Sequence, residues 1–177
     1  MIKKTVSCVK NCIRYIITRI KMGKNLQTNN FFRMGKDCDF VSSQNGKITL
    51  GSKVEFSKRN TIGAVEGNIH IGSNIFFNEN CIIVARDRIE IGDNCIFGPG
   101  VTIYDHDHVF DCDGIKEDYK TGPVIIDCGC WIGANVTILR NTHIGEGCVI
   151  GAGTIIKGEI PSHSRVTGSP NIVKTIV

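Results

Sequence analysis

The sequence predicts an all-β solenoid, a parallel β-helix, over most of its 177 residues. Three observations predict it. Aliphatic or phenylalanine residues return every six positions, several of them are followed directly by Gly, and small residues fill the fifth position of each six-residue unit. Such a period is typical of stacked coils in which each unit is one short strand and a turn. The 20 glycines fit this prediction, because tight corners favour residues that tolerate positive φ.

The six-residue period is continuous near the C-terminus and interrupted elsewhere. Shorter frames start at Leu50, Ile71 and Ile91, with slips of three and then two residues between them. The pattern stops between His108 and Val124, which predicts a protruding loop over residues 109–123. The unbroken series consists of Ile126, Ile132, Ile138, Ile144, Ile150 and Ile156.

The fifth positions predict a row of small, buried side chains. Four of the nine cysteines lie there, and we expect them to be reduced core residues, since no secretory signal precedes them. Cys128 and Cys130 form a pair, but no second pair or histidine set stands at a zinc-like spacing. We therefore expect no metal. The fifth positions are Val54, Asn60, Cys81, Cys95, Val101, Cys130, Val136, Thr142, Cys148 and Thr154.

Residues 1–36 are predicted to form a basic arm, and residues 37–177 the repeat domain with a C-terminal tail over 160–177. The arm has nine basic residues and no acid. The net charge of +4 therefore does not indicate binding to nucleic acid, and we exclude nucleic acid as a partner. Apolar residues recur at steps of three and four, which predicts an amphipathic helix ending near Gly23. They are Ile2, Val6, Val9, Ile13, Ile16 and Ile20.

Two partners of this helix remain open. Its stripe lies either on an anionic membrane surface, through residues 1–24, or against another subunit. Lys10 and Arg14 interrupt the apolar run, so the arm has neither a signal-peptide core nor a spanning segment. We expect a cytoplasmic protein, with peripheral contact at the inner face of a membrane under the first alternative.

The repeats, the break after Ile-Tyr-Asp-His-Asp-His (103–108) and the tail Ile-Pro-Ser-His-Ser-Arg-Val-Thr-Gly-Ser-Pro (160–170) resemble the hexapeptide-repeat acyltransferases. The galactoside, maltose and polysaccharide O-acetyltransferase branch is the most similar, over roughly residues 50–176. The resemblance implies a left-handed β-helix, a homotrimer and acetyl-CoA as the donor.

Acetyl transfer to a hydroxyl needs a base that removes the acceptor proton, and histidine suits that role near neutral pH. His106 and His108 stand where the repeat breaks into the loop. A gapless match to the family places its catalytic histidine at His108, with His106 as a substrate-binding or orienting neighbour. His70, His143 and His163 are expected to be ordinary surface residues.

The same match places the family's active-site asparagine at Asn78, although Asn also suits a left-handed turn at this position. His108 follows Asn78 by 30 residues, which leaves more than half a turn beyond one circuit of three repeats. One chain therefore does not easily bring the two together, and we expect the site between subunits of the trimer.

The resemblance implies further site residues. An acid near the end of the loop steadies the family's histidine, and Asp118 or Glu117 matches it. A second acidic position of the family reads Arg86 here, in the region expected to bind the acceptor. For coenzyme A, Trp131 starts the matching coil, and the backbone N–H of Ala134 would face the thioester oxygen. Gly151 and Ala152 would line the pantetheine arm, and Lys157 and Lys174 would meet the phosphates.

Three functions follow from these residues. The first is O-acetylation of a saccharide in surface polysaccharide or glycoconjugate biosynthesis. The second is N-acetylation of an amino-sugar nucleotide, although no added nucleotide-binding domain is visible before residue 37. The third is a metal-binding β-helix of the carbonic-anhydrase type, which the His-x-His spacing at 106–108 does not favour.

Overall fold

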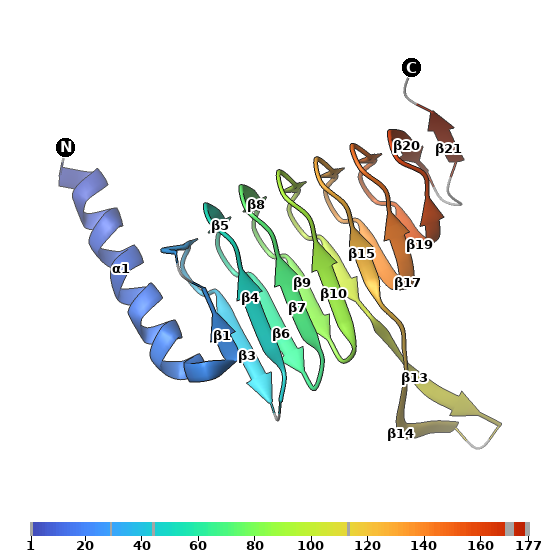
Figure 1. Ribbon diagram of the computed structural model, residues 1–177, viewed down its shortest axis with the longest axis horizontal. Coiled ribbons are helices and arrows are strands. Elements are labelled where there is room, and N and C mark those ends of the chain that lie inside the picture. The colour runs from blue at the N-terminus through green and yellow to red at the C-terminus, as the bar shows by residue number, and fades with distance from the viewer. Residues whose placement is uncertain (1, 29, 44, 113, 169–171, 176–177) are drawn as a thin grey trace.

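The computed structural model describes residues 2–28, 30–43, 45–112, 114–168 and 172–175. It begins with the helix α1 (Ile2–Met22), and a short 3-10 helix η1 (Gly23–Asn25) follows it. Gly23 has a φ of +52°, a left-handed conformation that ends a helix without strain when no side chain is present. The predicted helix and its end are confirmed. α1 lies across the N-terminal end of a stack of coils (Figure 1). None of the described helices is both long and apolar enough to cross a membrane.

The rest of the chain winds into about six turns of a parallel solenoid (Figure 1). One sheet forms two of its faces, because it continues around a corner of the coil. Its strands are β1 (Leu26–Gln27), β3 (Asp39–Ser43), β4 (Lys47–Leu50), β6 (Thr61–Val65), β7 (Asn68–Ile71), β9 (Ile82–Ala85), β10 (Arg88–Ile91), β12 (Thr102–Tyr104), β15 (Val124–Ile126), β17 (Thr137–Ile144) and β19 (Ile155–Ile160).

A second sheet forms the remaining face, with parallel pairing from β2 to β20 and an antiparallel last strand. It contains β2 (Arg33–Met34), β5 (Val54–Phe56), β8 (Ile75–Phe77), β11 (Ile96–Phe97), β16 (Trp131–Ile132), β18 (Val149–Ile150), β20 (Ser164–Thr167) and β21 (Ile172–Thr175). The corner of the first sheet lies in β17. There the N-terminal half pairs with β12, and the C-terminal half pairs with β15.

The predicted loop 109–123 is mostly an antiparallel hairpin. Its strands are β13 (His106–Asp111) and β14 (Gly114–Thr121), and they project from the stack between β12 and β15 (Figure 1). Phe110 and Ile115 pair near the tip and are 74 % and 77 % exposed. The prediction that this segment protrudes is confirmed, and the structure adds its strand pairing.

The core lies inside the coils and follows the six-residue period. Phe56, Phe77 and Phe97 stack on successive coils, with ring centroids 5.0 Å and then 4.5 Å apart. All ten predicted fifth positions are buried, including four cysteines. Burial raises the pKa of the Cys81 thiol to about 11, so it stays protonated at neutral pH. These cysteines are core residues, as predicted.

The β-helix begins earlier than the sequence indicated. Its first coil includes β1 and β2, within the predicted arm 1–36, so the arm is α1 and the solenoid starts near Leu26. Leu26, Phe32 and Met34 are buried and close the N-terminal end of the core. Leu26 and Phe32 are six residues apart, as are Met34 and the buried Phe40, and this end of the core packs against α1 and not against another coil.

Candidate active site

The hairpin carries both predicted histidines at its base. His106 pairs with Thr121, and His108 pairs with Tyr119 across the two strands. Both histidines line a pocket of about 930 Å³, together with Tyr104, Asp107 and the hairpin tip. Where the repeat breaks, Asp105, next in the chain after the strand residue Tyr104, turns its carboxylate into the body of the protein.

Asp105 is completely buried and fixes the start of the hairpin. Its carboxylate accepts the backbone N–H groups of Arg86, at 2.8 Å, and of Asp87, at 2.7 Å. The same group lies 2.9 Å from Nδ1 of His106, whose side chain is only 13 % exposed. This carboxylate therefore orients the ring of His106, a contact that no pattern in the sequence predicts.

His108 is exposed, and an aromatic ring holds it. The centroids of His108 and Tyr119 lie 4.6 Å apart. The guanidinium of Arg86 lies 3.6 Å from the centroid of the Tyr119 ring and 3.2 Å from a Glu66 carboxylate oxygen. Arg86 thus lies near both histidines, and Tyr119 links it to His108, while its contact with an acceptor stays a prediction.

The two predicted orienting acids lie on β14. Oδ1 of Asp118 accepts the backbone N–H of the next residue, Tyr119, at 2.8 Å. Glu117 is exposed. Within the described part of the chain, no hydrogen bond joins either acid to His108, so an orienting role for them stays a prediction.

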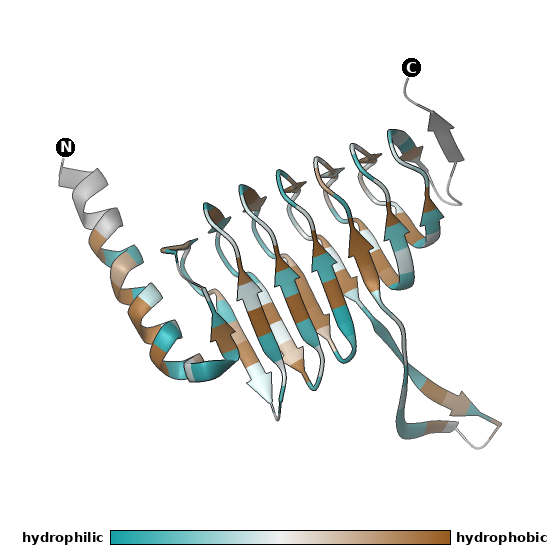
Figure 2. Ribbon diagram, viewed as in Figure 1, coloured by the Kyte–Doolittle hydropathy of each residue, from teal (hydrophilic) through white to brown (hydrophobic). Residues whose placement is uncertain are grey.

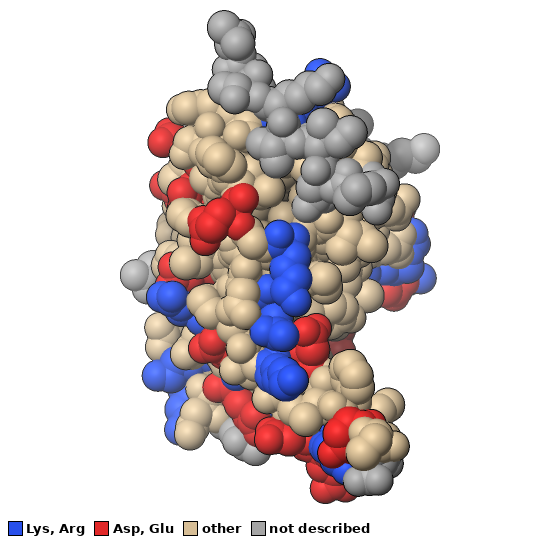
Figure 3. Space-filling view, turned by 90° about the vertical axis from the view of Figure 1, so that its right-hand side faces the viewer, with Lys and Arg blue, Asp and Glu red and all other residues tan. Residues whose placement is uncertain are grey.

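A second ion pair ties the hairpin to the solenoid. Nε of Arg140 on β17 lies 2.6 Å from Oδ2 of Asp107. The Arg140 side chain is 18 % exposed, so the pair is partly shielded from water. Figure 3 shows a row of Lys and Arg side chains descending this end of the molecule toward the hairpin, with acidic groups alongside.

The predicted coenzyme site lies elsewhere on the chain, in a groove of about 540 Å³ along the second sheet. The structure brings together here five residues that the sequence analysis singled out. They are Asn78, Trp131, Ala134, Gly151 and Ala152. Exposed Trp131 and Ile96 are cross-strand neighbours and give this groove an apolar floor.

Two backbone donors are available in the groove. The N–H groups of Gly133 and Asn135 donate to other backbone carbonyls, but that of Ala134 between them has no acceptor among the described residues. Ala152 repeats the arrangement one coil later, between the engaged Gly151 and Gly153. A Cβ on Gly98 would stand 2.7 Å from the Ala134 nitrogen, so glycine leaves this donor accessible. Fixed N–H groups of this kind stabilise a developing oxyanion.

Asn78 does not serve the turn that the alternative interpretation assigned to it. The left-handed residue there is Asn80, with a φ of 61°. Asn78 accepts the backbone N–H of Glu79 at 2.8 Å through its amide oxygen. Its amide nitrogen donates to no described residue, which leaves it available to a bound molecule.

The predicted phosphate-binding lysines have different positions. Lys157 is exposed on β19 and is not part of the groove lining. Lys174 lies on β21, where its backbone pairs with Arg165, and its side chain is outside the described residues. Arg165 itself lines the groove. No pattern in the sequence marks this residue as part of the groove, although it stands within the C-terminal motif that carried the resemblance.

The groove and the histidine pocket lie at different corners of the coil. Asn78 follows β8 of the second sheet, whereas His108 follows β12 of the first. No residue is shared by the linings of the two pockets. This separation agrees with the prediction that one chain does not bring Asn78 and His108 together.

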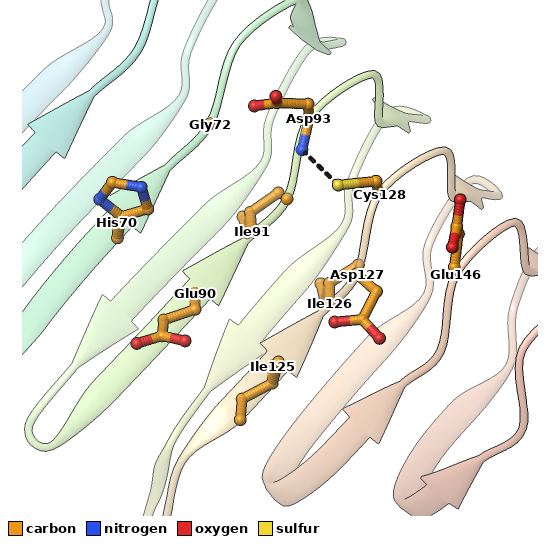
Figure 4. Close-up of a pocket in the computed structure, with 11 residues that line it drawn as sticks. His70, Gly72, Glu90, Ile91, Asp93, Ile125, Ile126, Asp127, Cys128 and Glu146 are labelled. Carbon is orange, nitrogen blue, oxygen red and sulfur yellow. Dashed lines mark hydrogen bonds between the residues drawn. The ribbon is translucent and has the colours of Figure 1, made fainter.

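A third pocket lies on the outer face of the first sheet and is acidic (Figure 4). Glu90, Asp93, Asp127 and Glu146 line it with His70, and Sγ of Cys128 accepts the backbone N–H of Asp93 at 3.3 Å. Its side chains are spread along several coils. Among the residues that the structure describes, no three His, Cys, Asp or Glu side chains are placed to hold a metal ion.

Comparison with known proteins agrees with this architecture. The family model described as bacterial transferase hexapeptide (six repeats) matches residues 123–158. A Mycobacterium tuberculosis protein named "Probable acetyltransferase Rv3034c" is 30 % identical over 87 % of this chain and 53 % of its own length. The galactoside O-acetyltransferase of Lactococcus lactis is 35 % identical over 60 % of this chain and 52 % of its own. The chain spans about half the length of the curated relatives it matches.

Solved structures share the fold. The N-acyltransferase AntD from Bacillus cereus, in complex with dTDP and 3-hydroxybutyryl-CoA, has a TM-score of 0.73 at 21 % identity and covers 88 % of this chain and 85 % of its own. A hexapeptide-repeat acetyltransferase from Vibrio cholerae, in complex with acetyl coenzyme A, has a TM-score of 0.61 at 21 % identity, over 92 % of this chain and 75 % of its own. The predicted left-handed parallel β-helix is thereby confirmed.

The six-residue period, the coil stack that it builds and the family match agree with one another. Residues 123–158 match the bacterial transferase hexapeptide repeat, and the chain is similar in fold to transferases built from that repeat.

Proposed function

We propose that this protein transfers an acetyl group from acetyl-CoA to a hydroxyl of a saccharide, within a homotrimer whose active sites lie between subunits. The observation that carries the proposal is the pair of separated half-sites. One is the apolar groove, where the backbone N–H groups of Ala134 and Ala152 bond to no described residue, and the other is the hairpin pocket with two histidines. Each half-site lacks what the other offers.

The groove suits acetyl-CoA. Trp131 and Ile96 offer apolar contact to a pantetheine arm, and Arg165 offers a cation for a phosphate. The N–H of Ala134 would stabilise the negative charge that develops on the thioester oxygen during attack. This proposal uses a backbone group, so it requires no particular side chain at residue 134.

The proposed base is His108. As the acceptor oxygen attacks the thioester carbon, His108 takes the hydroxyl proton, the carbon–sulfur bond breaks, and the proton passes to the departing thiolate. His106 is enclosed by Tyr104, Asp105 and Tyr119 of its own chain, whereas His108 is exposed on the projecting strand. Exposure favours His108 for reaching a donor that is bound by a neighbouring subunit.

Acyl transfer to an amino group is the second candidate. It is favoured by the likeness of the fold to AntD, whose structure holds dTDP together with an acyl-CoA. The curated relative from Lactococcus lactis, a galactoside O-acetyltransferase, favours the hydroxyl. The same base and groove would serve both acceptors.

A release assay for free coenzyme A, run with a panel of saccharides, amino sugars and sugar nucleotides, tests the proposal. We expect turnover with a hydroxyl acceptor that His108→Ala lowers by about 100- to 10,000-fold. His106→Ala is the matched comparison and should retain more activity. Turnover with amino acceptors alone would contradict hydroxyl transfer and support the second candidate, transfer to an amino group. Near-normal turnover of His108→Ala would remove this residue as the base.

A further inference from the structure

The apolar stripe of α1 faces away from its own protein. Val9, Ile13, Ile16, Ile17 and Ile20 are between 51 % and 78 % exposed. Figure 2 shows hydrophobic bands recurring along this helix beyond the end of the coil stack. Isolated exposed isoleucines are common on protein surfaces, but a continuous stripe of this kind marks an interaction surface.

The opposite face of the helix makes the contacts to the solenoid. Asn11 accepts the backbone N–H of Met34, Tyr15 packs against Phe31 and Phe32, and Thr18 bonds the Met34 sulfur. Rotation by about 100° per residue places the centres of the two faces on roughly opposite sides of the helix. The stripe therefore points outward, along the long axis of the molecule.

Basic groups accompany the stripe without acidic ones. Lys10 and Lys24 are exposed and form no ion pair with the residues that the structure describes, and residues 1–36 contain no acid. Lysine side chains beside an apolar stripe reach toward lipid phosphates while the isoleucines enter the acyl boundary. A complementary protein surface would have to supply acidic and apolar groups together, whereas an anionic bilayer supplies both everywhere.

We propose that α1 lies in the headgroup region of an anionic membrane, with its apolar stripe toward the acyl chains. In the proposed trimer, with its prisms side by side, the three helices would cover the same end of the assembly. Their stripes would then meet one lipid surface at once, which multiplies weak single contacts. Membrane binding does not depend on the acceptor or on His108, so its test stands apart from that of the proposed function.

Co-flotation of the full chain with vesicles tests this proposal. Vesicles of phosphatidylcholine with about one third phosphatidylserine should carry the protein, and pure phosphatidylcholine should carry it at least about tenfold less, because each basic residue contributes electrostatically. Raising the salt to about 0.5 M should release much of it. Ile16→Ser/Ile20→Ser should reduce flotation about tenfold or more, and Lys10→Glu/Lys24→Glu should do the same.

Ile155→Ser is the matched control, since Ile155 is as exposed as Ile16 but lies on β19. Its flotation should equal that of the unmodified chain, and circular dichroism should show all variants folded. Sedimentation velocity without vesicles tests the alternative that another chain packs against the stripe. If anionic vesicles do not carry the protein, the proposal is overturned. It is overturned as well if Ile16→Ser/Ile20→Ser lowers the oligomeric state, and the stripe is then a contact between chains.

Discussion

Oδ1 of Asp105 lies 2.9 Å from Nδ1 of His106. The same Asp105 carboxylate also accepts two backbone N–H groups from the preceding coil. One buried group thus joins the turn at Arg86 and Asp87 to the start of the hairpin. It stands at the point where the hairpin interrupts the six-residue repeat, which resumes at β15 in parallel pairing with β10.

Replacing Asp105 with Asn tests this relationship. The amide retains one acceptor oxygen but loses the charge and the second acceptor, so about 1–3 kcal/mol of folding free energy should be lost. Urea unfolding monitored by circular dichroism measures the loss. Asp87→Asn is the control, because Asp87 is exposed in the same turn. If the hairpin depends on Asp105 for its position, the pH–rate profile of transfer should change as well. Equal stability of the two variants would contradict the role given to Asp105.

Tyr119 should act as a positioning residue for His108, through its ring and not its hydroxyl. Aromatic pairs and cation–π contacts each contribute roughly 0.5–1.5 kcal/mol. Tyr119→Ala should therefore lower kcat by about 3- to 10-fold and leave the KM for acetyl-CoA unchanged, as steady-state kinetics would measure. Tyr119→Phe should restore kcat. Equal losses in both variants would assign the effect to the hydroxyl.

The division into half-sites predicts complementation between chains. Mixed trimers of His108→Ala and Asn78→Ala chains, unfolded and refolded together, should recover activity at the interfaces where an intact histidine faces an intact groove. Refolding each variant alone is the control and should give only the residual activity of that variant. If Asn78→Ala is inactive by itself and mixing rescues nothing, the shared site is wrong.

The six-residue period predicted the architecture because each buried position of a coil accepts only a few residue types. The core positions are therefore recognisable from the sequence. Phe56, Phe77 and Phe97 each stand six residues after the start of a frame, at Leu50, Ile71 and Ile91, and in the structure they stack in one column. The backbone donors of the groove were anticipated only through the resemblance, since an N–H group leaves no residue-type signal.

The contacts of the hairpin were not predictable in the same way. Tyr119 meets Arg86 and His108 through pairing across strands and packing against an earlier coil, and no period relates these positions. The apolar face of α1 was predicted correctly as a stripe, but its periodicity alone did not say whether it faces inward. The polar Asn11 and Thr18 take the inner side because they bond to Met34 of the first coil.

Arg165 should contribute to coenzyme binding. It lines the groove beyond Trp131, and charge-assisted contact to a phosphate is strong but screened at an exposed site. Arg165→Ala should raise the KM for acetyl-CoA by roughly 3- to 10-fold, with little change in kcat. The effect should shrink at high salt. Lys157→Ala is the comparison outside the groove. A larger rise in the KM for acetyl-CoA in that variant would indicate Lys157 as the phosphate-binding residue.

The surroundings of His143 predict that a part of the folding free energy depends on pH. The hydrogen bond to Asp127, at 3.0 Å, and the nearby charges of Asp127 and Glu159 raise its pKa. A raised pKa favours the protonated folded state, so this stabilisation is fully present below about pH 6.5, the unfolded value, and disappears as the pH rises through the folded pKa. The ring is 41 % exposed, so less than about 1 kcal/mol is at stake.

His143→Gln should therefore be less stable than the unmodified chain at about pH 5.5, and the difference should narrow toward pH 9. Urea unfolding at several pH values measures this difference. His70→Gln, on the same sheet face without an ion pair in the described part of the chain, should show no such trend. A difference that stayed constant with pH would mean that His143 stabilises the coil by packing, since only a charged ring interacts with Asp127 and Glu159 in a way that deprotonation removes.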